Sequence, residues 1–148
     1  MVSRPKKTTV KFINPALVDA NLKTQQTGTV NAGFPSPAND YIDNELNFKE
    51  LFIRHESATF FVQVAGNSMI DAGIFDGDIL VVDKSLDPND KSILVCFIDG
   101  EFTVKKVKKI KGTLYLVPEN PKFDLIPIKD TSDFRLWGVV TFSIHKHR

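Results

Sequence analysis

A serine and a group of lysines are the residues of this sequence best suited to do chemistry together. Ser68 follows an apolar segment and lies in the run Gly66-Asn67-Ser68-Met69. Glycine permits a sharp turn, and a serine that begins a helical turn has free backbone N–H groups close by. Such groups form an oxyanion hole when they point at a developing charge. A helix-capping serine has the same pattern, so the motif alone leaves both interpretations open.

A serine nucleophile needs a base, and histidine is the usual one. The three histidines are His55, His145 and His147, and none has an evident acidic partner in the sequence. His145 and His147 alternate, so they are expected to share one face at a solvated strand end. Because no further ligands cluster near them, we predict no metal site and no cofactor.

A neutral lysine is the alternative base. Residues 103–109 contain Lys105, Lys106, Lys108 and Lys109. A lysine pKa near 10.4 must fall by about three units to act near neutral pH, a difference of roughly 4 kcal/mol, and burial is one way to lower it. Because side chains alternate along a strand, Lys105 lies on one face and Lys106 and Lys108 lie on the other. This alternation does not decide which face is buried. The residues therefore permit a Ser–Lys pair without requiring one.

Short strands are the elements that must position these residues. Apolar segments separated by turn residues predict a mainly β fold, a sandwich or partly open barrel with few short helices. Asp99-Gly100 is typical of a type I′ hairpin turn. A short turn or helix is expected within residues 44–52, and an extended N-terminal arm precedes the domain, with some local structure around Phe12-Ile13. The expected strands are residues 59–65, 78–83, 92–98, 101–110, 113–117 and 134–144.

Charge and composition argue against several classes of function. The 148 residues carry a net charge of +1, of which residues 1–32 contribute +4 (five basic residues, one acidic), so the remainder is −3. The body lacks a basic face, so sequence-specific DNA binding is not expected. The single cysteine, Cys96, lies in an apolar run, where a thiol is usually inert. The sequence shows neither a membrane span nor a secretory signal, so no membrane association and a cytoplasmic location are expected.

Three segments, in order, resemble the LexA/UmuD family of self-cleaving serine peptidases. The first is Ala32-Gly33-Phe34-Pro35-Ser36-Pro37-Ala38, the second runs from residue 57 to 78 around Ser68, and the third runs from Asp99 to Lys106. Gly33 lies 35 positions before Ser68, and Lys105 lies 37 positions after it. The resemblance covers residues 32 to about 142 and is strongest to UmuD, the short mutagenesis subunit.

The resemblance implies a role for each matching residue. Ser68 is the nucleophile, Lys105 is its general base, and the backbone N–H groups of Asn67 and Ser68 form the oxyanion hole. The bond between Ala32 and Gly33 is cleaved, which divides the chain into an arm, residues 1–32, and a Ser-Lys peptidase domain, residues 33–148. UmuD proteins often have Cys-Gly at the cleavage site, whereas this chain has Ala-Gly, as LexA does.

The family also implies partners and a cellular role. A RecA–single-stranded DNA filament stimulates cleavage, and the processed homodimer activates a UmuC-like, error-prone translesion polymerase in the SOS response. A LexA-type repressor lacking its DNA-binding domain is one alternative, since a 32-residue arm is too short for a helix-turn-helix domain. A peptidase that processes other proteins and a non-catalytic binding module are two others; in the module, Ser68 caps a turn and Lys105 lies at the surface.

Overall fold

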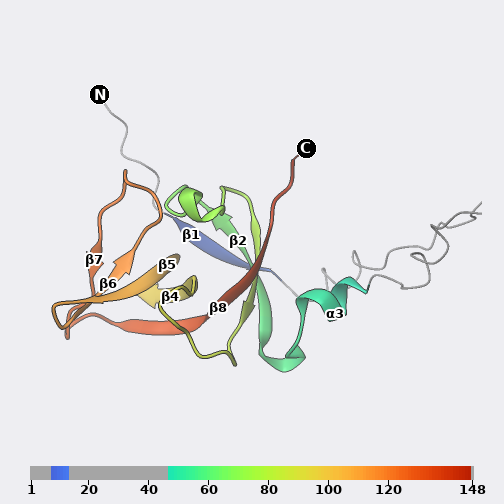
Figure 1. The fold of residues 1–148 in the computed structure, drawn as a ribbon, viewed down its shortest axis with the longest axis horizontal. Helices are drawn as coiled ribbons and strands as arrows, with labels where there is room; N and C mark the ends of the chain where they lie inside the picture. The colour runs from blue at the N-terminus through green and yellow to red at the C-terminus, as the bar shows by residue number, and fades with distance from the viewer. Residues whose placement is uncertain (1–7, 14–46, 148) are drawn as a thin grey trace, which may run out of the picture.

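A computed structural model describes residues 8–13 and 47–147, and within them the predicted mainly β fold is confirmed. The strands form one antiparallel sheet in the order β1-β2-β3-β8-β4-β5-β6-β7 (Figure 1). They are β1 Thr9–Ile13, β2 Thr59–Ala65, β3 Ile79–Asp83, β4 Leu94–Ile98, β5 Glu101–Ile110, β6 Thr113–Val117, β7 Ile126–Pro127 and β8 Phe134–Ile144. The short helices are α3 Phe48–Phe52, η1 Glu56–Ala58 and η2 Ile70–Ala72.

Most predicted strands are found where the sequence places them. The bounds of β2, β5, β6 and β8 are those predicted, while β3 and β4 begin one and two residues later. Asp99 and Gly100 have φ angles of 47° and 89°, which confirms the type I′ turn signal. Strands β1 and β7 were not predicted. The first lies inside the expected arm, and the second has only two residues.

Strand β8 bends the sheet at two bulges. Its register with β4 skips Trp137, and its register with β3 skips Thr141. A bulge adds one residue to one strand, which increases the local twist and turns the strand. One half of β8 pairs with β3 and the other half with β4, so the bend at β8 curls the two sides of the sheet toward each other.

The curl brings strands that are far apart in the sheet order into contact. In a flat sheet β1 and β5 would lie about 24 Å apart, five steps at about 4.8 Å each. Instead, the rings of Phe12 on β1 and Phe102 on β5 have centroids 4.9 Å apart. The Thr103 hydroxyl also donates a 3.0 Å hydrogen bond to the carbonyl of Thr8. The prediction of a partly open barrel describes this arrangement well.

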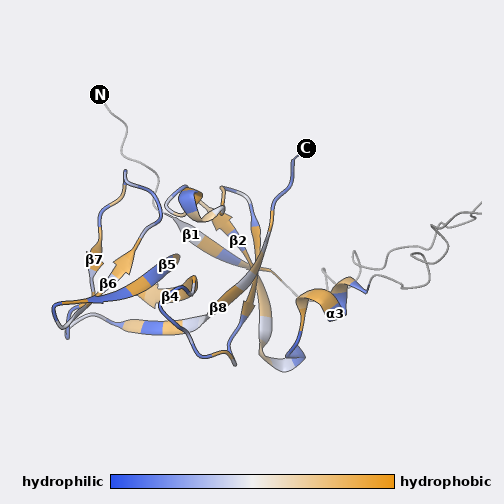
Figure 2. Cartoon of the chain, in the orientation of Figure 1, coloured by the Kyte–Doolittle hydropathy of each residue, from blue (hydrophilic) through white to orange (hydrophobic). Residues whose placement is uncertain are grey.

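Hydrophobic residues are concentrated in the strands, although β5 and β8 also contain hydrophilic stretches, and the connecting turns are mostly hydrophilic (Figure 2). One buried cluster joins β2, β3, β4 and β5 and includes Met69 and Ile74 from the segment after β2. A second cluster contains Leu94, Cys96 and Leu116. Met69 is only 1% exposed, so the residue next to Ser68 is fixed in the core. No helix within residues 8–13 and 47–147 is long and apolar enough to cross a bilayer.

Gly138, which lies between the two bulges of β8, should tolerate no side chain because its neighbours leave no room for one. A Cβ at this position would come 2.7 Å from Val82 Cγ1 and 3.2 Å from the Asp83 carbonyl oxygen. We expect Gly138→Ala to lower the free energy of unfolding by about 1–3 kcal/mol, measured by urea denaturation. Ser143→Ala on the exposed end of the same strand is the control and should change it by less than about 0.5 kcal/mol. Equal effects of the two substitutions would contradict the close packing at Gly138.

Candidate active site

Ser68 is held in a tight turn that follows β2. Gly66 has a φ of 108°, a conformation that favours glycine, and its N–H donates to Asp76 Oδ1 at 2.8 Å. The side chain of Ser68 is fully buried. Met69 enters the core directly after it, and η2 begins at Ile70. The predicted helical turn after Ser68 is therefore present as a single 3-10 turn.

The segment around residues 119–120 fixes this turn from the other side. The Ser68 carbonyl accepts a hydrogen bond from Glu119 N at 2.8 Å, and the Asn67 carbonyl accepts one from Asn120 Nδ2 at 2.8 Å. Asp71 N donates in turn to the Glu119 carbonyl at 2.8 Å. Bonds on both sides of Ser68 leave its backbone little freedom, which is what a preorganised site needs.

Lys105 is buried on the inner face of β5. It is 4% exposed, whereas Lys108 and Lys109 on the same strand are exposed. Its Nζ donates to Ser68 Oγ at 2.7 Å, to Thr103 Oγ1 at 2.9 Å and to the Val104 carbonyl at 2.9 Å. These three acceptors are neutral. The structure thus brings together the two side chains that the sequence singled out, although 37 positions separate them.

Thr8 is the third hydroxyl at the site. It is 1% exposed, and its Oγ1 accepts hydrogen bonds from the Ser68 N–H, at 2.9 Å, and from Ser68 Oγ. An oxygen atom therefore lies beside one of the N–H groups predicted to form the oxyanion hole. The predicted role of the Asn67 N–H stays a prediction.

A cleft of about 270 Å³ opens beside Lys105. Its lining includes Thr8, Thr103 and Lys105 together with carboxylates and apolar side chains. The cleft reaches Lys105 and Thr8, whereas Ser68 is not among the residues that line it. The remaining lining residues are Ile98, Asp99, Glu101, Phe123, Asp124 and Ile126.

Cys96 lies close to Lys105 but is unsuited to act as a nucleophile. It is fully buried in the second core cluster, and burial raises the pKa of its thiol to about 12, although the nearby Lys105 acts in the opposite direction. A thiol with so high a pKa stays protonated at neutral pH, which fits the expectation of an inert cysteine in an apolar strand.

Two histidines have aspartate partners that the sequence did not reveal. His55 Nδ1 lies 2.7 Å from Asp83 Oδ2, and His145 Nδ1 contacts Asp78 Oδ1. No sign of these pairs was evident in the sequence, because the partners lie 28 and 67 positions apart and meet only in the folded chain. Among the residues described, no cluster of three or more His, Cys, Asp or Glu side chains is placed to hold a metal ion.

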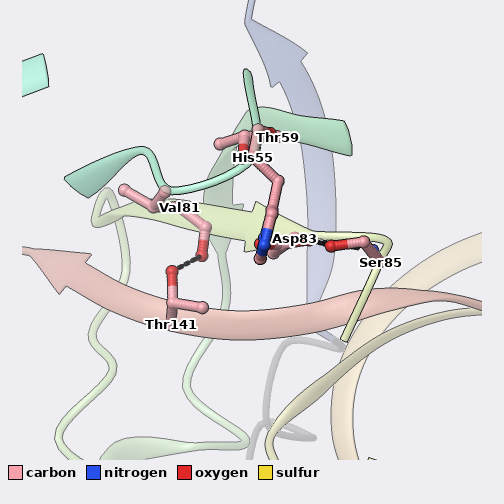
Figure 3. Close-up of polar contacts among 6 residues, drawn as sticks. All are labelled: His55, Thr59, Val81, Asp83, Ser85 and Thr141. Atoms are coloured by element: carbon pink, nitrogen blue, oxygen red, sulfur yellow. Dashed lines mark hydrogen bonds and ion pairs between the residues drawn. The ribbon is translucent and has the colours of Figure 1, made fainter. Parts of the chain in front are cut away.

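The His55–Asp83 pair does not assemble a serine triad. Ser85 donates through both its hydroxyl, at 2.6 Å, and its N–H, at 2.8 Å, to Asp83 Oδ1 (Figure 3). A catalytic triad instead requires the serine hydroxyl to bond to histidine. The contacts among His55, Asp83 and Ser85 therefore link the end of β3 to the loop before η1 and have a structural role.

Comparisons with known proteins identify the family. A model of the Peptidase S24-like family matches residues 25–141. MucA of Salmonella typhimurium is 46% identical over 119 residues, which are 80% of this chain and 81% of MucA. SamA of the same species is 44% identical over 117 residues, 79% of this chain and 81% of SamA. The chain belongs to the Peptidase S24-like family. The resemblance to the LexA/UmuD family is thereby confirmed.

Within this S24-like chain, several residues that shape the site escaped sequence analysis. Thr103 was detectable in principle, because residues two apart on a strand share a face and Thr103 lies two before Lys105. Thr8 and Asn120 carried no such signal, since their places depend on contacts 60 and 53 positions away. The predicted cleavage site, Ala32–Gly33, lies outside the described residues.

The Asp83 contacts should make stability depend on pH. Burial raises the pKa of Asp83, but hydrogen bonds from Ser85 and His55 outweigh it and hold the pKa below its ordinary 3.8. A lowered pKa stabilises the fold above the unfolded-state pKa, and this contribution is lost as the pH falls through the folded-state pKa. We expect Asp83→Asn to lower the free energy of unfolding by about 1 kcal/mol at pH 7. The difference should shrink below about pH 4.

Urea denaturation of both proteins at pH 7, 4 and 3 measures this difference. Asp90→Asn in an exposed loop is the control and should match the wild type at each pH. A deficit of Asp83→Asn that stays constant from pH 7 to pH 3 would show that the carboxylate charge is not what stabilises this contact.

Proposed function

We propose that this protein is a self-cleaving serine endopeptidase that uses Ser68 as nucleophile and Lys105 as general base. The observation that carries the proposal is the 2.7 Å contact between Lys105 Nζ and Ser68 Oγ, both buried. A serine within hydrogen-bond reach of a base is the arrangement that nucleophilic catalysis requires. Membership of the Peptidase S24-like family supports the same chemistry.

The surroundings of Lys105 favour its role as a base. Burial disfavours a charged ammonium and so lowers the pKa of a lysine. The Thr103 hydroxyl and the Val104 carbonyl hold Nζ toward Ser68, at 2.9 Å each. Two such contacts orient the nitrogen so that its lone pair, once the proton has left, can face the serine hydroxyl.

In the proposed reaction, Lys105 Nζ removes the hydroxyl proton while Ser68 Oγ forms a bond with the Ala32 carbonyl carbon. The C–N bond to Gly33 then breaks, and the lysine gives its proton to the leaving amine. Water hydrolyses the resulting ester and restores the Ser68 hydroxyl. The products are residues 1–32 and residues 33–148.

The backbone N–H of Ser68 is a suitable oxyanion donor. It already binds the Thr8 hydroxyl oxygen at 2.9 Å, within the range for an oxyanion contact. The hydrogen bonds from Glu119 and Asn120 hold the turn in place, so the donor needs no reorganisation during the reaction. In our proposal the Asn67 N–H is the second donor.

The proposed cellular role is that of a UmuD-type protein in the SOS response. A RecA–single-stranded DNA filament stimulates cleavage, and the processed homodimer activates an error-prone translesion polymerase in the cytoplasm. The similarity to MucA and SamA along about four fifths of their lengths supports this role. The LexA repressor of Leptothrix cholodnii is 37% identical over 121 residues, yet this match covers only 52% of the repressor. Because the match covers more of MucA and SamA than of the repressor, the UmuD-type role is favoured over the repressor alternative.

Self-cleavage is tested by incubating the purified protein at pH 7 and pH 10 and recording intact masses over time. We expect one cut, between Ala32 and Gly33, that is faster at pH 10 because Lys105 acts in its neutral form. Ser68→Ala and Lys105→Ala should each abolish the cut. Lys108→Ala, an exposed lysine of the same strand, is the matched control and should cut at the wild-type rate.

An uncut wild type is tested again with RecA, an ATP analogue and single-stranded DNA. The absence of a cut even then, or an equal cut in Ser68→Ala, would contradict the proposal. The non-catalytic binding module would then be the better interpretation.

A further inference from the structure

Strand β1 pairs with the edge of β2 that faces away from β3. β2 pairs with β3 on one side and with β1 on the other, with Thr9 opposite Ala65 and Ile13 opposite Phe61. An extended segment that reaches Ser68 along β2 must use the edge that β1 fills. A strand has only two edges, so β1 and such a segment cannot bind there together.

Thr8, directly before β1, lies against the nucleophile itself. Its hydroxyl oxygen accepts from both the N–H and the Oγ of Ser68. The first bond occupies the proposed oxyanion donor, and the second directs the Ser68 proton away from Lys105. A scissile carbonyl needs both of these groups, so Thr8 blocks the reaction at the atoms that perform it.

Phe12 anchors the other end of this segment. Its ring lies 5.6 Å from Phe60, 4.9 Å from Phe102 and 6.3 Å from Trp137, measured between centroids. Aromatic pairs at such distances attract each other beyond simple burial. Phe12 is nevertheless 42% exposed, so this anchor is a contact at the surface of the sheet.

We propose that residues 8–13 are a built-in inhibitory strand that must leave β2 before the cleavage segment can enter the site. The inference rests on the proposed self-cleavage. Ala32 lies 19 positions after Ile13 (32 − 13). Nineteen residues reach up to about 63 Å when extended, whereas β1 is only about 17 Å long. The arm is therefore long enough to bring Ala32 back to Ser68 once β1 has left.

A reversible cross-link tests the inhibitory strand. Lys11 and Gln63 are opposite each other in the β1–β2 register, and both are exposed. Opposite residues in antiparallel strands have Cα atoms about 4.5–5.5 Å apart, a separation that a disulfide can bridge. Lys11→Cys combined with Gln63→Cys should therefore lock β1 in place on oxidation. Cys96 is fully buried and should not interfere.

The cleavage rate is measured by intact mass for oxidised and reduced forms of the full chain. We expect the oxidised double variant to cut at least tenfold more slowly than its reduced form, and the wild type to cut equally in both conditions. Lys11→Cys alone is the matched control and should also be insensitive to oxidation. Equal cleavage rates for the oxidised and reduced double variant would overturn the proposal that β1 is inhibitory. If the wild type and every reduced form stay uncut even with the RecA filament, the proposed function fails, and this inference fails with it.

A second variant loosens the strand instead of locking it. Phe12→Ala removes the anchor and should raise the cleavage rate on the order of tenfold, because β1 leaves more often. The emission of Trp137, the only tryptophan, should change at the same time, since Phe12 packs near its ring. Phe142→Ala, a similarly exposed ring that packs on Phe52, is the control and should leave the cleavage rate unchanged. A slower or unchanged rate in Phe12→Ala overturns the proposal.

Discussion

The curl of the sheet is the constraint on which the site depends. Four pairing steps separate β2, which leads to Ser68, from β5, which carries Lys105. In a flat sheet these steps would span about 19 Å, too far for a lysine side chain to bridge. The two bulges in β8 and the close fit at Gly138 bend the sheet, so that Nζ and Oγ meet at 2.7 Å.

The same curl creates the chemical environment of the pair. By closing β1 against β5, it buries Ser68, Lys105, Thr103 and Thr8 together. Buried polar groups are costly unless hydrogen-bonded. Here each hydroxyl and the amine have partners within the group, and among the described residues no buried side-chain nitrogen or oxygen lacks one. In our proposals, the hydrogen bonds that stabilise this closed arrangement also keep Ser68 from its substrate.

The sequence predicted much of this architecture and the identity of the central pair. Apolar segments separated by turn residues located β2, β5, β6 and β8, and the family resemblance singled out Ser68 and Lys105. Strand β1 was not predicted, because five residues of a polar arm form a strand only through pairing with β2 and the contacts of Phe12. The aspartate partners of His55 and His145 were missed for a related reason, since strand pairing brings them together over long separations.

The most direct test of the account is a titration of Lys105 itself. The Cε signal of Lys105 can be followed by NMR from pH 6 to pH 11 in uniformly labelled protein and assigned by its loss in Lys105→Ala. We predict a midpoint clearly below the ordinary lysine pKa of about 10.4, because the ammonium is buried. A midpoint at or above that value would mean that Lys105 stays charged beside Ser68 and cannot serve as its base.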